Sequence, residues 1–250
     1  MNEVVKLERH DVIGIVTVNS PPVNALSAAV RGGMLECIKA AIADPEIKAI
    51  VLTCGGRTFI AGADITEFGK PPKPPGLMEV LAEMENSPKP VVAAIHGTAL
   101  GGGLEVALAC HYRVAVKEAR LGLPEVKLGL LPGAGGTQRL TRLCGPGVAR
   151  RLILGAEMVN GSQARELGVV QWAIAPEQLE ARTRDLVASI AALPAAALAG
   201  CKRCLAVAEE GRESGFAMEL HETRQLLGRE DTRARIVEFL GKGKTQEIAR

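Results

Sequence analysis

Three consecutive glycines, Gly101-Gly102-Gly103, place the strongest constraint on how this chain folds. The apolar run 91–95 before them predicts a short buried strand, and residues 104–110 after them favour a helix. At a strand-to-helix turn, glycines allow a ligand to approach the backbone closely because they carry no Cβ atom. The start of the following helix offers N–H groups without partners and the positive end of the helix dipole, which suits an oxyanion.

Glu105 lies on the first turn of this predicted helix, among apolar neighbours. A buried carboxylate is costly unless it is paired or takes part in chemistry. The same stretch is also compatible with a tight helix-packing turn that carries a surface glutamate. The glycine motif therefore indicates a candidate site, and other parts of the sequence have to decide between the two interpretations.

The composition narrows the possible classes of function. Hydrophobic residues make up 47% of the 250 residues, enough for a substantial core, whereas aromatic residues make up only 2%. The predicted core is therefore aliphatic, and the aromatic side chains on which nucleic-acid bases stack are scarce. The formal net charge is +2 with interspersed signs, which indicates no polyanionic partner. We expect no nucleic-acid partner and no membrane partner, because no apolar run approaches the ~20 residues of a membrane span.

The ends of the chain and its cysteines indicate a reducing compartment. Residues 1–6 do not resemble a signal peptide, and residues 246–250 carry no retention or peroxisomal signal, so we expect a cytoplasmic protein. Only Cys201 and Cys204 have CxxC spacing, and no second pair or histidine cluster accompanies them. We therefore predict reduced thiols and no metal site. The six cysteines are Cys37, Cys54, Cys110, Cys144, Cys201 and Cys204.

The order of the predicted elements favours an α/β fold. Predicted strands cover residues 12–18, 49–53, 91–95, 112–116 and 169–174. A helix predicted up to Ile42 separates the first two strands, and this β–α–β order indicates a parallel crossover. Further helices are predicted at residues 78–84, 137–143 and 148–154, and from an N-cap at Ser162 to Leu167.

The pattern changes after residue 175. Helical segments then follow one another without a convincing strand, at residues 176–193, 194–208, 213–227 and 232–240. We therefore predict a β/α body over residues 1–175 that carries the site, and an all-helical region over residues 176–250. No internal repeat is visible in the sequence.

A second turn of small residues, 61–64, also follows a predicted strand. The carboxyl ends of parallel strands share one edge of a sheet, so the N–H groups of Ala63 and Gly102 can converge on one oxygen. Two convergent donors form an oxyanion hole. Glu105 and Glu125 are then candidates for an acid–base pair acting on a water molecule, because repulsion and desolvation of two carboxylates in an apolar pocket raise the pKa of at least one of them. The alternative for Glu125 is a surface loop residue.

Other motifs carry less weight. Gly133-Ala134-Gly135 resembles the start of a dinucleotide-binding fingerprint, but the third glycine is missing and no strand leads into it. No Walker lysine follows either glycine turn, and no serine lies in a GxSxG elbow. The histidines are not spaced as metal ligands; they are His10, His96, His111 and His221.

Three segments closely resemble the enoyl-CoA hydratase/isomerase, or crotonase, family. They are FIAGADI (Phe59–Ile65), HGTALGGGLE (His96–Glu105) and LGLPEVKLGLLPGAGGTQRL (Leu121–Leu140). The likeness covers nearly the whole chain and is nearest to the hydratase portion of multifunctional fatty-acid oxidation proteins, whose dehydrogenase half does not fit in 250 residues. The resemblance implies a crotonase-like spiral of ββα units with a C-terminal helical region that joins subunits into a homotrimer or a dimer of trimers.

The resemblance also implies the roles of individual residues. Ala63 and Gly102 match the donors to the thioester oxygen, and Glu105 and Glu125 match the two catalytic glutamates. Positions that match the coenzyme A path are Val23, Ala61, Asp64 and Ile65, with Gly133 near the acyl group. Phe239 and Lys242 match a tail motif that reaches coenzyme A across a subunit interface. Two departures concern the phosphate contacts: Thr66 stands where hydratases often carry lysine, and the ending 241–244 lacks the usual tail pattern.

By this resemblance we expect an enoyl-CoA hydratase of fatty-acid β-oxidation, a carbon–oxygen lyase that adds water to trans-2-enoyl-CoA. Coenzyme A is then part of the substrate, and no separate cofactor is implied. A Δ3,Δ2-enoyl-CoA isomerase is the near alternative, because such isomerases often keep only the glutamate at the Glu125 position. A non-catalytic binding module is the alternative from another class, which the low aromatic content disfavours.

Overall fold

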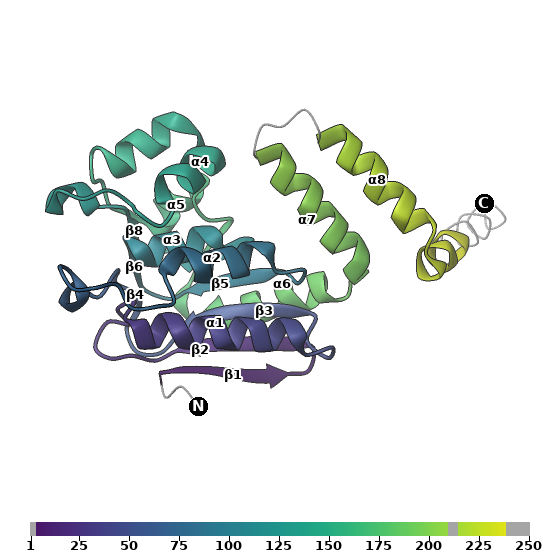
Figure 1. Cartoon of the computed structure of the whole chain (residues 1–250), viewed down its shortest axis with the longest axis horizontal. Helices are drawn as coiled ribbons and strands as arrows, with labels where there is room; N and C mark the ends of the chain where they lie inside the picture. The colour runs from purple at the N-terminus through teal and green to yellow at the C-terminus, as the bar shows by residue number, and fades with distance from the viewer. Residues whose placement is uncertain (1–3, 210–214, 239–250) are drawn as a thin grey trace. The chain divides into compact units, whose positions relative to one another are not determined.

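The computed structural model describes residues 4–209 and 215–238, which form two compact units, Met1–Ala192 and Leu193–Arg250. The first unit contains two β-sheets and the helices that pack on them (Figure 1). It extends beyond the predicted boundary at residue 175, because helix α6 (Leu179–Ala191) packs against strands of the larger sheet. A run of helical sequence therefore begins inside the first unit.

The larger sheet has six strands in the order β1-β2-β3-β5-β7-β10. Their bounds are Val5–His10, Ile13–Val18, Ala49–Cys54, Val91–Ile95, Tyr112–Val116 and Trp172–Ile174. The parallel pairing of β2 with β3, from Ile13 opposite Ala49 to Val18 opposite Cys54, confirms the predicted crossover. Strand β1 pairs antiparallel with β2 and was not predicted, because most of its residues are exposed or only partly buried at the sheet edge.

The smaller sheet has four short strands in the order β4-β6-β8-β9. They are Thr58–Ile60, Thr98–Leu100, Arg120–Gly122 and Val159–Asn160. The first three run parallel, and β9 is antiparallel to β8. The sequence did not predict β6, β8 or β9, because strands of two or three residues are too short to show a periodic pattern.

The two sheets receive strands from the chain in turn. Each of β3, β5 and β7 lies in the larger sheet, and a short connection leads from it to β4, β6 or β8 in the smaller sheet. Helices then follow before the next strand of the larger sheet (Figure 1). This repeated arrangement is the spiral of ββα units that the family resemblance implied, although the sequence itself shows no repeat.

The helices of the first unit agree with most of the predicted ones. In chain order they are α1 (Ala28–Ala43), α2 (Leu77–Asn86), α3 (Gly102–Ala109), α4 (Gly136–Ile153), α5 (Gly161–Glu166) and α6. Helix α4 joins the two predicted helices across Gly145, which is not helical (φ 79°, ψ 165°). Short 3-10 turns lie at Ile65–Glu67 and Glu125–Leu128.

The predicted N-cap at Ser162 is wrong, because the cap of α5 is Asn160. The Asn160 side chain accepts a hydrogen bond from Gln163 N at 2.9 Å, and the Gln163 side chain accepts one from Asn160 N at 2.9 Å. This reciprocal capping box satisfies two backbone donors at the helix start. Ser162 therefore lies inside the first turn.

The second unit contains helices α7 (Ala195–Glu209) and α8 (Gly215–Leu227), which pack against each other. A doubly hydrogen-bonded ion pair joins them, from the Arg203 guanidinium to both Glu222 carboxylate oxygens at 2.7 and 2.6 Å. Residues 230–238 form a further helix. Across the described residues, no single helix has the length and apolar composition of a membrane span. The segments Pro176–Ala191 and Ala195–Val207 reach that length and composition only when they are taken together as one bent pair.

A buried guanidinium group, that of Arg113, binds the carboxyl end of helix α3. Arg113 of β7 is only 3% exposed and donates hydrogen bonds to four carbonyl oxygens, those of Ala107 (3.2 Å), Leu108 (3.5 Å), Cys110 (2.6 Å) and Val169 (2.8 Å). Its positive charge lies at the negative end of the helix dipole. Arg113 therefore holds the carboxyl end of the helix whose amino end carries the three glycines.

Replacing Arg113 with methionine should lower the free energy of unfolding by about 2 kcal/mol or more, because it removes the donor to the Cys110 and Val169 carbonyls and each buried carbonyl left without a donor costs roughly 1–3 kcal/mol. Urea unfolding followed by circular dichroism measures the change. Arg9→Met is the matched control, since the exposed Arg9–Glu46 pair at 3.8 Å is worth at most about 1 kcal/mol. Equal unfolding midpoints for the two variants would contradict the role given to Arg113.

Candidate active site

Each of the three glycines meets a different spatial requirement. Gly101 has φ +53°, and a Cβ atom there would lie 3.1 Å from Glu125 Oε1. A Cβ atom at Gly103 would overlap the carbonyl group of Ile60, the last residue of β4. The glycine run therefore lets the first turn of α3 sit directly on the end of β4, with the Glu125 carboxylate beside it.

The two predicted oxyanion-hole donors lie next to each other. A Cβ atom at Gly102 would be 3.7 Å from Ala63 N, although 39 positions of sequence separate the residues. Leu26 N donates to Gly62 O at 2.9 Å, and this short parallel bridge positions Ala63. Within the described part of the chain, neither the Ala63 N–H nor the Gly102 N–H donates a hydrogen bond. Both donors are therefore available to one acceptor.

Glu105 is a buried carboxylate held by the start of α4. Its side chain is on α3 and is 3% exposed, and Oε1 accepts hydrogen bonds from Ala134 N and Gly136 N, both at 2.8 Å. Burial raises the pKa of Glu105, while the N–H groups of Gly136 and Ala134 and the charge of Arg139 oppose that shift. A Cβ atom at Gly136 would lie 3.0 Å from Glu105 Oε1, so this approach also requires glycine.

Glu125 begins the short turn after β8 and is half-buried. Its Oε2 atom is buried and has no hydrogen-bond partner among the described residues. Burial raises the pKa of Glu125, and the negative charge of Glu105 raises it further. The Oε1 atom of Glu125 lies 3.1 Å from the position of a Cβ atom on Gly101 and its Oε2 atom is buried, so Glu125 is not the surface loop residue of the alternative interpretation.

The remaining predicted residues lie on the segments that surround these groups. Ala61 N donates to Val23 O at 3.1 Å, which joins two of the residues predicted along the coenzyme A path. Asp64 caps the 3-10 turn Ile65–Glu67 by accepting from Thr66 N (2.9 Å) and Thr66 Oγ1 (2.8 Å). These bonds lower the pKa of Asp64. Thr66 therefore has a local structural role at the position where hydratases often carry lysine.

Of the three predicted residues that remain, the structure describes only Gly133. Gly133 is exposed in the segment that joins Glu125 to the start of α4. Phe239 and Lys242, the predicted tail contacts, lie outside the described residues. Their part in the site stays a prediction.

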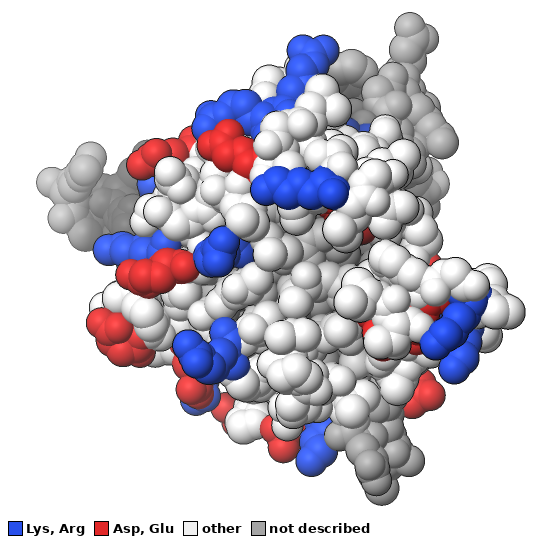
Figure 2. All heavy atoms as spheres, turned by 90° about the vertical axis from the view of Figure 1, so that its left-hand side faces the viewer, with Lys and Arg blue, Asp and Glu red and all other residues white. Residues whose placement is uncertain are grey.

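The face that carries these connections has few charges at its centre. Figure 2 shows that uncharged side chains dominate this face and that charged residues lie mainly towards its margin. The connections after β4 and β8 carry exposed apolar side chains, namely Ile65, Phe68, Val126, Leu128, Leu130 and Leu131. An apolar surface beside two carboxylates and two N–H donors suits a substrate with an aliphatic chain and a polar reacting group.

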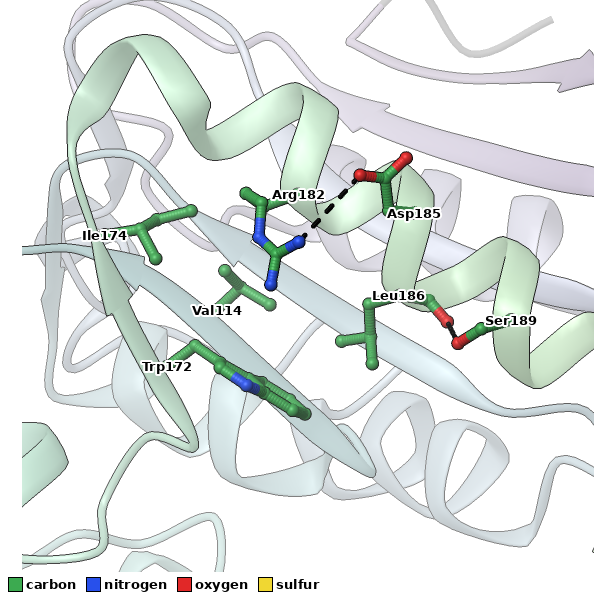
Figure 3. A pocket seen from close by; sticks show the side chains of 7 residues that line it. All are labelled: Val114, Trp172, Ile174, Arg182, Asp185, Leu186 and Ser189. Carbon is green, nitrogen blue, oxygen red and sulfur yellow. Dashed lines mark hydrogen bonds and ion pairs between the residues drawn. The ribbon is translucent and has the colours of Figure 1, made fainter.

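A groove elsewhere in the first unit does not belong to this site. It has a volume of about 270 Å³ and lies between β7, β10 and helix α6. Figure 3 shows the Trp172 ring at one side of it and the Arg182–Asp185 pair, at 4.0 Å, on α6. None of the predicted site residues lines it.

Sequence analysis missed several residues that hold the site. Asn24 is 3% exposed at φ +53°, and its side-chain amide donates to Gly55 O (2.9 Å) and Thr58 O (2.7 Å). Arg139 on α4 donates to the Ala134 carbonyl oxygen and to Glu85 on α2. The only sequence signal for a turn that binds the Glu105 carboxylate was the position of Ala134 just before a predicted helix. The partners of Asn24 are backbone carbonyls, which cannot be recognised from the sequence.

Comparison with known proteins identifies the family. The sequence profile described as enoyl-CoA hydratase/isomerase matches residues 8–247. A peroxisomal bifunctional enzyme from Danio rerio is 50% identical over 158 residues, which are 63% of this chain and 22% of that protein. A probable enoyl-CoA hydratase from Bacillus subtilis (strain 168) is 42% identical over 165 residues, which are 63% of this chain and 64% of that protein. The chain thus spans less than two thirds of the length of either relative.

The fold leads to the same family. A crystal structure of enoyl-CoA hydratase subunit I from Geobacillus kaustophilus HTA426 matches with a TM-score of 0.89 and 34% identity, over 96% of this chain and 95% of that one. This protein therefore belongs to the enoyl-CoA hydratase/isomerase family and has the crotonase fold, with two mixed sheets and C-terminal helices. The family acts on acyl-CoA thioesters.

The buried charge of Glu105 predicts a stability change with a defined pH dependence. A carboxyl group whose folded-state pKa lies above its unfolded value stabilises the fold below the unfolded pKa, and that contribution is lost as pH rises through the folded pKa. Glu105→Gln should therefore raise the thermal midpoint at pH 7–8 relative to the original protein, and the gain should shrink towards pH 4. Thermal unfolding between pH 4 and 8 tests this. A gain that grows as pH falls would contradict the raised pKa.

Proposed function

We propose that this protein is an enoyl-CoA hydratase, which adds water across the C2=C3 bond of a trans-2-enoyl-CoA in fatty-acid β-oxidation and gives the 3-hydroxyacyl-CoA. The observation that carries the proposal is the presence of two carboxylates, the buried Glu105 and the half-buried Glu125, beside the adjoining N–H groups of Ala63 and Gly102. The relation to enoyl-CoA hydratases supports it.

In this proposal the thioester oxygen accepts hydrogen bonds from Ala63 N and Gly102 N. When water attacks C3, the π electrons of the double bond move towards C2 and the thioester oxygen, so negative charge grows where the two donors lie. Preorganised donors of this kind stabilise the transition state more than the ground state. Both N–H groups belong to main chain fixed by β4 and α3, so little reorganisation is required during the reaction.

The two carboxyl groups take different parts because their surroundings differ. Glu105 accepts the proton from the attacking water, since two N–H donors and the charge of Arg139 favour its anion. Glu125 delivers a proton to C2, because its unpartnered Oε2 and the neighbouring negative charge favour its protonated form. The hydroxyl group of water is then bonded to C3 and a proton to C2. Transfer of the proton from Glu105 to Glu125 restores the starting state.

Δ3,Δ2-enoyl-CoA isomerisation is the second candidate, and the unpartnered oxygen of Glu125 is the observation that favours it. One carboxylate suffices to move a proton between C2 and C4, and the same oxyanion hole serves both reactions. The carboxylate of Glu105 has no task in such a shuttle. The pair of carboxylates therefore supports hydration over isomerisation.

Hydration of crotonyl-CoA should be faster than isomerisation of a 3-enoyl-CoA. The variants Glu105→Gln and Glu125→Gln should each lower kcat for hydration by ~10²–10⁴, because each substitution removes one acid–base group. Absorbance of the conjugated thioester follows both reactions, since it falls as water adds and rises as a 3-enoyl bond moves into conjugation. Consumption of a 3-enoyl-CoA without any consumption of crotonyl-CoA would establish the isomerase instead. Near-normal hydration by either variant would remove that glutamate from the mechanism.

The helical second unit is proposed to join subunits. Its helices carry exposed apolar side chains, which include Leu205, Leu220, Ile236 and Val237. Such side chains are expected to pack against a neighbouring copy. Sedimentation equilibrium should give the mass of a trimer or hexamer, and an active monomer at micromolar concentration would contradict this proposal.

A further inference from the structure

A single guanidinium group joins three separate segments around the proposed oxyanion hole. Arg31 lies on the first turn of α1, and its side chain is 11% exposed. It donates to Leu26 O (2.6 Å), to Pro75 O (2.8 Å), to Lys73 O (2.8 Å) and to Glu67 Oε2 (2.9 Å). All three of its nitrogens are used in these bonds, so the orientation of the group is fixed.

The first of these segments contacts both oxyanion-hole donors. Leu26 pairs with Ala63 through the bond from Leu26 N to Gly62 O. Leu26 Cδ1 also lies 2.9 Å from the position of a Cβ atom on Gly102. Arg31 holds the carbonyl of this same residue, so any shift of Leu26 changes the spacing between the Ala63 and Gly102 N–H groups.

The second segment is the turn that follows Ala63. Glu67 ends the 3-10 turn capped by Asp64, and its Oε1 accepts from Ala28 N at 2.8 Å at the start of α1. This bond and the charge of Arg31 lower the pKa of Glu67, so the carboxylate stays ionised at neutral pH. Ala63 lies between β4, which precedes it in the chain, and this turn, which follows it. The Arg31–Glu67 pair therefore fixes the segment that follows Ala63.

The third segment leads into α2. Lys73 and Pro75 belong to the loop before Leu77, the first residue of that helix. Leu77 Cδ2 lies 3.4 Å from the position of a Cβ atom on Gly102, so the start of α2 packs over the second donor. Through the two loop carbonyls, Arg31 fixes this contact as well.

We infer that Arg31 is a positioning residue for the thioester carbonyl: it sets the geometry of the Ala63 and Gly102 N–H groups without contacting the substrate. This inference rests on the proposed function. A planar guanidinium reaches four acceptors in fixed directions, whereas a lysine ammonium has three donors on a flexible stem. Misplacement of a catalytic group by about 1 Å costs up to ~10² in rate. The effect of losing Arg31 should therefore appear in kcat and in carbonyl polarisation more than in binding.

The test uses 4-(dimethylamino)cinnamoyl-CoA, whose absorption moves to longer wavelength when hydrogen bonds polarise its carbonyl. The original protein should shift the absorption of the bound thioester. Arg31→Met should lose at least half of that shift and lower kcat for crotonyl-CoA by ~10–100-fold, with KM changed less than about threefold. Arg31→Lys should fall between the two proteins in both measurements.

Lys89→Met provides the matched control at the other end of α1. The Lys89 ammonium donates to Ala41 O (2.7 Å) and Asp44 O (2.6 Å), so its loss weakens the same helix far from the donors. This variant should lower the thermal midpoint but keep the full absorption shift and kcat. An equal loss of shift in Lys89→Met would overturn the inference, because a general loosening of α1 would then explain the effect.

The outcomes separate the inference from the proposed function. A full shift and normal kcat in Arg31→Met would overturn the inference alone. An original protein that neither hydrates crotonyl-CoA nor shifts the absorption of the bound probe would overturn the proposed function, and the inference with it. If Arg31→Met does not fold by circular dichroism, Arg31→Lys decides the question by the same two measurements.

Discussion

The contact between Gly103 and the carbonyl group of Ile60 is the constraint on which the site depends. Any side chain at residue 103 would occupy the space of that carbonyl, so only glycine lets α3 rest on the end of β4. Because Ala63 follows β4 closely in the chain, the contact of α3 with the end of β4 brings Ala63 beside Gly102 at the start of the helix. It also turns the positive end of the helix dipole towards the same place. Arg113 at the far end of α3 completes the support, since it donates to the buried carbonyls of Cys110 and Val169.

In the proposed reaction, two glutamates of equal intrinsic acidity become different reagents through their neighbours. The start of α4 presents two N–H groups to Glu105, whereas one oxygen of Glu125 has no partner among the residues described. Burial destabilises the charged form of both groups, and this lowers the free energy of unfolding. A site of this kind is maintained by the surrounding core, because local interactions alone would favour moving both carboxylates into water.

Features that depend on local composition can be predicted from the sequence, whereas features that depend on distant main-chain atoms cannot. The buried strands at residues 91–95 and 112–116, the glycine turn and the pair Glu105–Glu125 all leave patterns that can be read directly. Strand β6 could not be predicted, because three residues show no period. The role of Arg31 was also hidden: its partners Lys73 O and Pro75 O are backbone carbonyls 42 and 44 positions away, and a carbonyl oxygen has no sequence signature.

The alternation of strands between the two sheets has a consequence for how the first unit folds. Since β3, β5 and β7 enter one sheet and β4, β6 and β8 the other, no single cut in the chain separates a complete larger sheet from a complete smaller one. Neither sheet can therefore be an autonomous folding intermediate assembled from a contiguous fragment, and the long-range pairings must form together. Folding of this unit is expected to be slow and highly cooperative, and truncated halves of it should gain no native structure until they are mixed and complement each other.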